Sequence, residues 1–99
     1  MKRLFISQPM NGRSNRAIME ERQGIIDDYM TKGWDVIDSV LNMGPADAIK
    51  YLAASIELMS DADRVLMMRG WEKARGCKIE HEVAVLYGKD IVYENGSAD

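Results

Sequence analysis

One glutamate in the second half of the chain has the surroundings of a reacting group. Glu80 follows a short loop framed by Gly70 and Gly76, and it lies near the start of an expected helix. The helix dipole and the free backbone amides at that end would hold its carboxylate ionised, which is the state that a nucleophile needs. Simple charge complementarity with a helix N-terminus is the commoner explanation of such a glutamate, so both interpretations stay open.

The loop that follows the first expected strand carries groups that suit an anionic ligand. Gly12 lets the backbone approach a ligand closely, and Arg13 and Arg16 can donate charged hydrogen bonds to a phosphate. Ser14 or Asn15 can cap the next helix, whose free amides also favour an anion. The alternative is an ordinary strand-to-helix turn with solvated arginines.

An alternation of strands and helices must position these two loops. The apolar periodicity and the glycine and proline positions predict strands at 3–7, 34–38, 64–68 and 90–93, with helices at about 15–32, 46–60 and 76–87. This pattern predicts a small three-layer flavodoxin/Rossmann-like α/β fold, with a four-stranded parallel sheet in the order 2-1-3-4 and three helices. Ligands of such sheets bind at the carboxyl ends of the strands, here the loops after the first and third strands.

Composition limits the possible partners. The net charge is −3 with no block of lysine or arginine, which argues against nucleic acid as the main partner. No apolar stretch is long enough to cross a membrane, and the first residues do not have the pattern of a signal peptide. The single cysteine cannot form an intrachain disulfide. We therefore expect a cytoplasmic protein. A chain of 99 residues buries a modest core, which favours a homodimer or a higher homo-oligomer. Residues 1–94 are expected to form one nucleotide-binding domain and 95–99 a short flexible tail.

Two side chains close to Glu80 can also titrate. His81 lies about 100° further round the helix, so we expect it to face solvent. Cys77 is near the helix start, where a thiol pKa can fall, but without a partner pattern it is expected to be a small packing residue. No zinc, haem or dinucleotide fingerprint occurs in the sequence, and we therefore expect no metal and no cofactor.

The spacing of small residues around Glu80 resembles the nucleoside 2-deoxyribosyltransferase family. There a glycine stands four residues before a catalytic glutamate, as Gly76 does here, and an alanine and a glycine follow it as Ala84 and Gly88 do. The segment from Gln8 to Arg16 resembles the phosphate-binding loop of the related nucleoside 5′-monophosphate N-glycosidases. The motifs at 6–12, 70–72 and 75–77 are closest to a short phage- and bacterium-associated branch of unassigned function, the DUF4406-like proteins.

The resemblance implies an enzyme that cleaves or transfers the N-glycosidic bond of a (deoxy)nucleoside 5′-monophosphate in the cytosol of a bacterium or phage-infected host. Glu80 would attack the anomeric carbon, as the nucleophile of a retaining glycosidase does, and Trp71 would stack on the base. The residues expected to bind substrate are Ser7, Gln8, Pro9, Met10, Asn11, Gly12, Arg13, Ser14, Arg16, Gly70, Trp71, Arg75 and Gly76.

The sequence departs from the family at the groups that would assist catalysis. The larger transferases have an aspartate six residues before the glutamate, where this chain has Ala74, and a second carboxylate that corresponds to Ser55 here. Their C-terminal segment, which completes a neighbour's site, is expected to be missing. A leaving base needs a proton, for which Glu72 and Glu57 are the candidates. The alternative function is therefore a non-catalytic protein that sequesters or senses a nucleotide or a nucleotide-derived signal.

Overall fold

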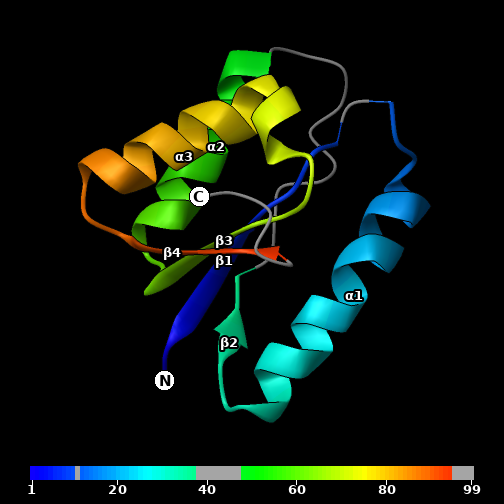
Figure 1. Ribbon diagram of the computed structural model, residues 1–99, viewed down its shortest axis with the longest axis vertical. Coiled ribbons are helices and arrows are strands. Elements are labelled where there is room, and N and C mark those ends of the chain that lie inside the picture. The colour runs from blue at the N-terminus through cyan, green and yellow to red at the C-terminus, as the bar shows by residue number, and fades with distance from the viewer. Residues whose placement is uncertain (11, 38–47, 95–99) are drawn as a thin grey trace.

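The computed structural model describes residues 1–10, 12–37 and 48–94, which form an α/β fold (Figure 1). Within these residues the strands and helices alternate along the chain, apart from one short 3-10 helix after the third strand. Their bounds are β1 Arg3–Ser7, α1 Asn15–Thr31, β2 Asp35–Val36, α2 Ala48–Ser60, β3 Arg64–Met67, the 3-10 helix Trp71–Lys73, α3 Arg75–Leu86 and β4 Asp90–Tyr93.

The four strands form one parallel sheet in the order β2-β1-β3-β4, which confirms the predicted topology. Helix α1 lies on one face of the sheet, and α2 and α3 lie together on the other (Figure 1). Alternate residues of β1 therefore point into two different cores. Leu4 and Ile6 belong to the cluster that packs with residues of α1, whereas Phe5 belongs to the cluster that includes residues of α2 and α3.

Several helix and strand ends differ from the prediction. Strand β2 is shorter than expected, and residue 38 lies outside the described residues. Helix α3 begins before Gly76, because Ala74 has an extended conformation and Arg75 is already helical. The predicted start of α2 at residue 46 and the expected tail at 95–99 also lie outside the described residues. In the part of the chain that the structure describes, no helix is long and apolar enough to cross a membrane.

Candidate active site at the carboxyl ends of β1 and β3

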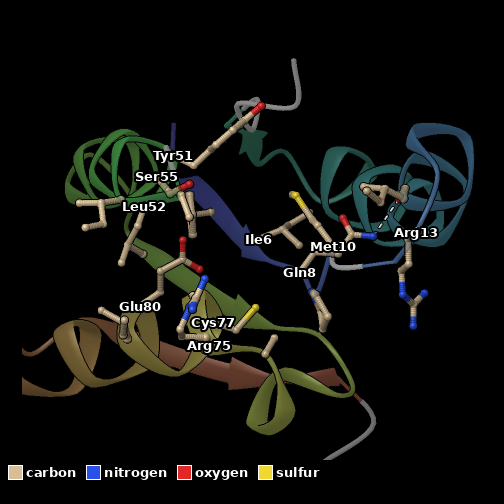
Figure 2. A pocket seen from close by; sticks show the side chains of 18 of the residues that line it. Ile6, Gln8, Met10, Arg13, Tyr51, Leu52, Ser55, Arg75, Cys77 and Glu80 are labelled. Carbon is tan, nitrogen blue, oxygen red and sulfur yellow. Dashed lines mark hydrogen bonds between the residues drawn. The ribbon is translucent and has the colours of Figure 1, made fainter. Parts of the chain in front are cut away.

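A pocket of about 750 Å³ opens at the carboxyl end of β1, between α1 on one side and α2 and α3 on the other (Figure 2). This is the size of a small-molecule site, and it lies at the edge of the sheet where the strand order predicts a ligand. The residues that line it are Phe5, Ile6, Gln8, Pro9, Met10, Arg13, Asn15, Ile18, Ala48, Ile49, Tyr51, Leu52, Ser55, Ala74, Arg75, Gly76, Cys77, Ile79 and Glu80.

Glu80 is held at the pocket wall by hydroxyl groups from two other elements. Its side chain is buried, with the residue only 7% exposed, although it faces the pocket. Ser7, at the end of β1, donates a hydrogen bond from Oγ to Glu80 Oε1 at 2.6 Å. Ser55, on α2, is a further hydrogen-bond partner of this carboxyl group. Ser7 of β1 and Ser55 of α2 thus fix the one carboxyl group among the described pocket residues.

Burial raises the pKa of Glu80, while the hydrogen bonds from Ser7 and Ser55 act in the opposite direction and are weaker. This corrects the expectation that the helix N-terminus holds the carboxylate ionised. Glu80 lies beyond the first turn of α3, where the influence of the helix terminus has faded, and transfer of a charge out of water disfavours the ionised form.

Cys77 also lies beside Ser7 and Glu80, and its thiol is unreactive. The residue is buried in the core, and burial raises the pKa of its thiol to about 11. The thiol therefore stays protonated at neutral pH, where a nucleophilic cysteine would have to be ionised. The structure confirms the expectation that Cys77 is a packing residue.

Trp71 and His81 form an aromatic cluster with Tyr93 that does not line the pocket. The rings of Trp71 and His81 are 4.2 Å apart between centroids, and His81 Nε2 lies 2.7 Å from the Tyr93 hydroxyl in a hydrogen bond. The expectation that His81 faces solvent is therefore wrong. Trp71 is 9% exposed and belongs to the core, so the expected stacking on a base does not fit its position.

Gly70 lies just before this cluster, likewise outside the pocket lining. Its φ of +90° is a conformation that side chains rarely adopt, and it turns the chain from β3 into the 3-10 helix. Gly70 makes this turn in the described structure, and its expected contact with the substrate stays a prediction.

Only some of the described residues of the loop after β1 line the pocket, and others interact elsewhere. Gln8, Pro9, Met10 and Arg13 line the pocket. Arg13 forms an ion pair with Glu21 of α1, so its charge is already partly compensated. Asn11, which was expected to contact the ligand, lies outside the described residues.

Other expected phosphate ligands of this loop do not line the pocket. Ser14 caps α1, because its Oγ accepts a hydrogen bond from the Ala17 amide at 3.1 Å. Arg16 forms an ion pair with Glu20 on the exposed side of α1, at 3.2 Å. Gly12 has a φ of +73° in the turn that precedes the cap.

The N-terminus of α3 offers an alternative place for an anion. Arg75 and Gly76 line the pocket there. No side chain caps this helix at Ala74, and the first amides of a helix have no partners within it. A helix N-terminus with free amides favours a negatively charged group, and the Arg75 guanidinium adds a charged donor.

A second acid and a metal cluster are both lacking among the described residues of the pocket. Glu72 and Glu57, the expected proton donors, are exposed and do not line it. Ala74 does line it, at the position where the transferases have an aspartate. The described residues also contain no group of three histidine, cysteine, aspartate or glutamate side chains that could hold a metal ion.

Sequence reasoning missed the wall that α2 contributes. Ile49, Tyr51 and Leu52 line the pocket opposite the first loop. The apolar pattern of α2 predicted a helix face that packs on the sheet, and no local motif indicated that this face would also border a pocket.

Comparisons with known proteins agree with the fold. The family model described as Domain of unknown function (DUF4406) matches residues 2–93. Among solved structures, the Clostridium botulinum CMP N-glycosidase BcmB is similar, with a TM-score of 0.54 and 23% sequence identity, over 93% of this chain and 70% of that chain. At this identity the likeness shows a shared fold. No curated protein matched.

Proposed function

Since the chain belongs to the DUF4406 family, whose description names no activity, we propose its function from the pocket. The protein binds a nucleoside 5′-monophosphate there and cleaves or transfers its N-glycosidic bond, with Glu80 as the nucleophile. The observation that carries this proposal is the Glu80 carboxyl group, buried at the wall of a nucleotide-sized pocket and fixed by the Ser7 hydroxyl at 2.6 Å. The fold that the chain shares with a CMP N-glycosidase supports it.

The reaction needs Glu80 in its ionised form. A carboxylate oxygen attacks the anomeric carbon, and the bond from this carbon to the base nitrogen breaks as the new ester bond forms. The base leaves with the electron pair and takes up a proton. Water, or an N–H nitrogen of a second base, then attacks the same carbon, loses a proton to the solvent and releases the Glu80 carboxylate, so that the proton taken up by the leaving base is balanced. The first acceptor makes the protein a hydrolase and the second a transferase.

The pocket also offers groups that can hold the other parts of the ligand. The 5′-phosphate would bind the free amides at the start of α3 together with Arg75. Ile18, Leu52 and Ile79 give the pocket apolar walls against which a base can pack. This arrangement replaces Trp71, which is buried in the aromatic cluster, as the surface that holds the base.

A second function, nucleotide binding without turnover, is favoured by one specific observation. Glu80 is the one carboxyl group among the pocket residues that the structure describes, so no second side chain of this kind is in place there to protonate the leaving base. A protein with this pocket and no turnover would sequester or sense a nucleotide.

The test is to incubate the protein with a mixed pool of nucleosides, nucleotides and cyclic dinucleotides. Mass spectrometry then records both the free base that is released and the ligands that the protein retains. We expect the wild type to release base and Glu80→Gln to lose this activity by on the order of a thousandfold or more, while it still retains the nucleotide. The matched control is Glu82→Gln, an exposed glutamate on the same helix, which should behave as wild type.

Two other outcomes would decide against the enzyme. Retention of intact nucleotide without release of base would establish the binding function and remove the nucleophilic role of Glu80. Neither release nor retention of any nucleotide would contradict both functions.

A further inference from the structure

Gln8 carries a polar atom at the pocket wall for which the described part of the chain supplies no partner. The residue directly follows β1 and is 5% exposed. Its Nε2 donates to the Ile18 carbonyl oxygen at 2.8 Å and to Glu21 Oε1 at 3.3 Å. Its Oε1 is buried and accepts no hydrogen bond from any residue that the structure describes. A buried acceptor without a donor destabilises the structure unless something supplies the donor.

The partners of Nε2 decide which way the carboxamide points. Both are acceptors, a backbone carbonyl and a carboxylate, so only the amide nitrogen can face them. The oxygen must then point to the other side. Figure 2 shows the nitrogen of Gln8 on the side of α1 and the oxygen turned away from that helix. The orientation of the acceptor is thus set before any ligand binds.

We propose that Gln8 Oε1 accepts a hydrogen bond from an N–H or O–H group of the bound nucleotide and selects ligands that carry such a donor. This inference rests on the proposed function and adds to it the chemical class of the substrate. The donor has two possible sources, the exocyclic amino group of a base and the 2′-hydroxyl group of a ribose. In either case the ligand supplies the donor that Gln8 Oε1 lacks among the described residues.

Gln8 Oε1 is covered in the described structure, so a ligand reaches it only if a side chain at this wall moves. Met10 lines the same wall and is only half-buried, and an unbranched thioether changes its conformation easily. We expect that movement of this side chain gives the ligand access to Oε1. A ligand with an acceptor at this place, such as a keto group instead of an amino group, would bring its oxygen against Gln8 Oε1 with no proton between the two atoms. Such a ligand should therefore bind more weakly.

The experiment measures dissociation constants in a Glu80→Gln background, so that no base is released during the titration. Three comparisons separate the sources of the donor: CMP with UMP, AMP with IMP, and each ribonucleotide with its 2′-deoxy form. We expect the ligand with the donor to bind roughly 10- to 100-fold more tightly in at least one comparison. Gln8→Met, which removes the acceptor and keeps the length of the side chain, should reduce this preference to less than about threefold.

The matched control is Leu52→Ile, which alters the apolar wall that α2 contributes without changing a polar atom and should change the affinity for both members of a pair alike. If Gln8→Met does not fold, Gln8→Asn withdraws the oxygen by one methylene group and should likewise abolish the preference. Equal binding of all pairs by the parent protein, or a preference that survives loss of the Gln8 oxygen, would overturn this inference and leave the proposed function standing. Absence of binding by every nucleotide would overturn both.

Discussion

The protonation of one buried carboxyl group controls the proposed chemistry. Burial raises the pKa of Glu80, so a larger fraction of the carboxyl group is protonated at a given pH than in an exposed glutamate. Only the ionised form attacks. The rate of base release should therefore rise with pH through the pKa of Glu80, and this rise should come above the usual glutamate range near pH 4.3.

Removal of the Ser7 hydroxyl group should move this rise further. Ser7 donates to Glu80 Oε1, and a donor stabilises the ionised form more than the neutral form. Ser7→Ala therefore raises the pKa of Glu80, and the rise in rate shifts to higher pH, while the rates converge where Glu80 is ionised in both proteins. The pH profile of kcat/KM measures this shift, and the carbon-13 resonance of the carboxyl group reports the same titration without turnover.

The control for Ser7→Ala is Ser60→Ala. The Ser60 hydroxyl donates to the carbonyl oxygen of Glu57 at the exposed end of α2, so its loss should leave the profile of Glu80 in place. An unchanged profile in Ser7→Ala would show that this hydrogen bond does not tune the nucleophile.

At the scale of single residues, the sequence was enough to select Glu80 as the candidate nucleophile but not to predict its burial or its hydrogen bonds. The spacing from Gly76 to Glu80 was visible in a single segment. The hydrogen bond from Ser7 to Glu80 joins residues 73 positions apart, and it depends on the register of β1 against its neighbours and on the packing of α3. The burial that raises the pKa of Glu80 is likewise a tertiary effect. Motif spacing carries no information about either.

At the scale of the helix and strand, α1 provides a test of what the first loop does. Ser14 accepts a hydrogen bond from the Ala17 amide and so caps α1. Ser14→Ala should lower the free energy of unfolding by about 1 kcal/mol, as measured by denaturant titration, and should leave the affinity for nucleotide unchanged because Ser14 does not line the pocket.

Ser14→Asp is the matched control, since aspartate is also a good cap and should keep most of the stability. A strong loss of nucleotide affinity in Ser14→Ala with unchanged stability would mean that Ser14 binds the phosphate, as the family resemblance implies.

Errors in the predicted ends of helices explain why some residues expected at the site do not line the pocket. The loop between Gly70 and Gly76 read as open chain, which made Trp71 a natural candidate for contact with a base. In the structure this loop contains a 3-10 helix and then the first turn of α3, and Trp71 packs against His81 on that helix. A periodicity argument could not predict this stacking, because it joins an aromatic ring of a loop to a side chain expected to be solvated.

At the scale of the whole molecule, the strand order was predictable and the pocket was only partly so. Strict alternation of strands and helices with short connections leaves few parallel topologies, and the order β2-β1-β3-β4 is among them. That order also located the ligand crevice at β1 and β3. The wall formed by α2 was not predictable, because the apolar pattern of that helix indicates a face that packs on the sheet and does not show that part of this face borders a pocket.

The exposed apolar surface of α2 predicts association of two copies. This helix has one lysine and one glutamate among its 13 residues, and Met59 is its one fully buried side chain, while Tyr51, Leu52, Ile56 and Leu58 are half-buried. Ile49 at its start, which also lines the pocket, is 75% exposed. A chain of this size gains stability when such a face is covered, and a second copy offers a matching face by two-fold symmetry. We expect a mass of about twice 11.2 kDa by light scattering.

A charge at the α2 surface should prevent this association. Ile49→Lys would have to bury an ammonium group in the interface, which is unfavourable without a partner charge, and the expected product is a folded monomer. Met30→Lys is the matched control, because Met30 is 60% exposed on α1, which lies on the opposite face of the sheet (Figure 1). It should therefore leave the dimer intact. A wild-type monomer at high micromolar concentration, or a dimer broken by Met30→Lys and not by Ile49→Lys, would contradict association through α2.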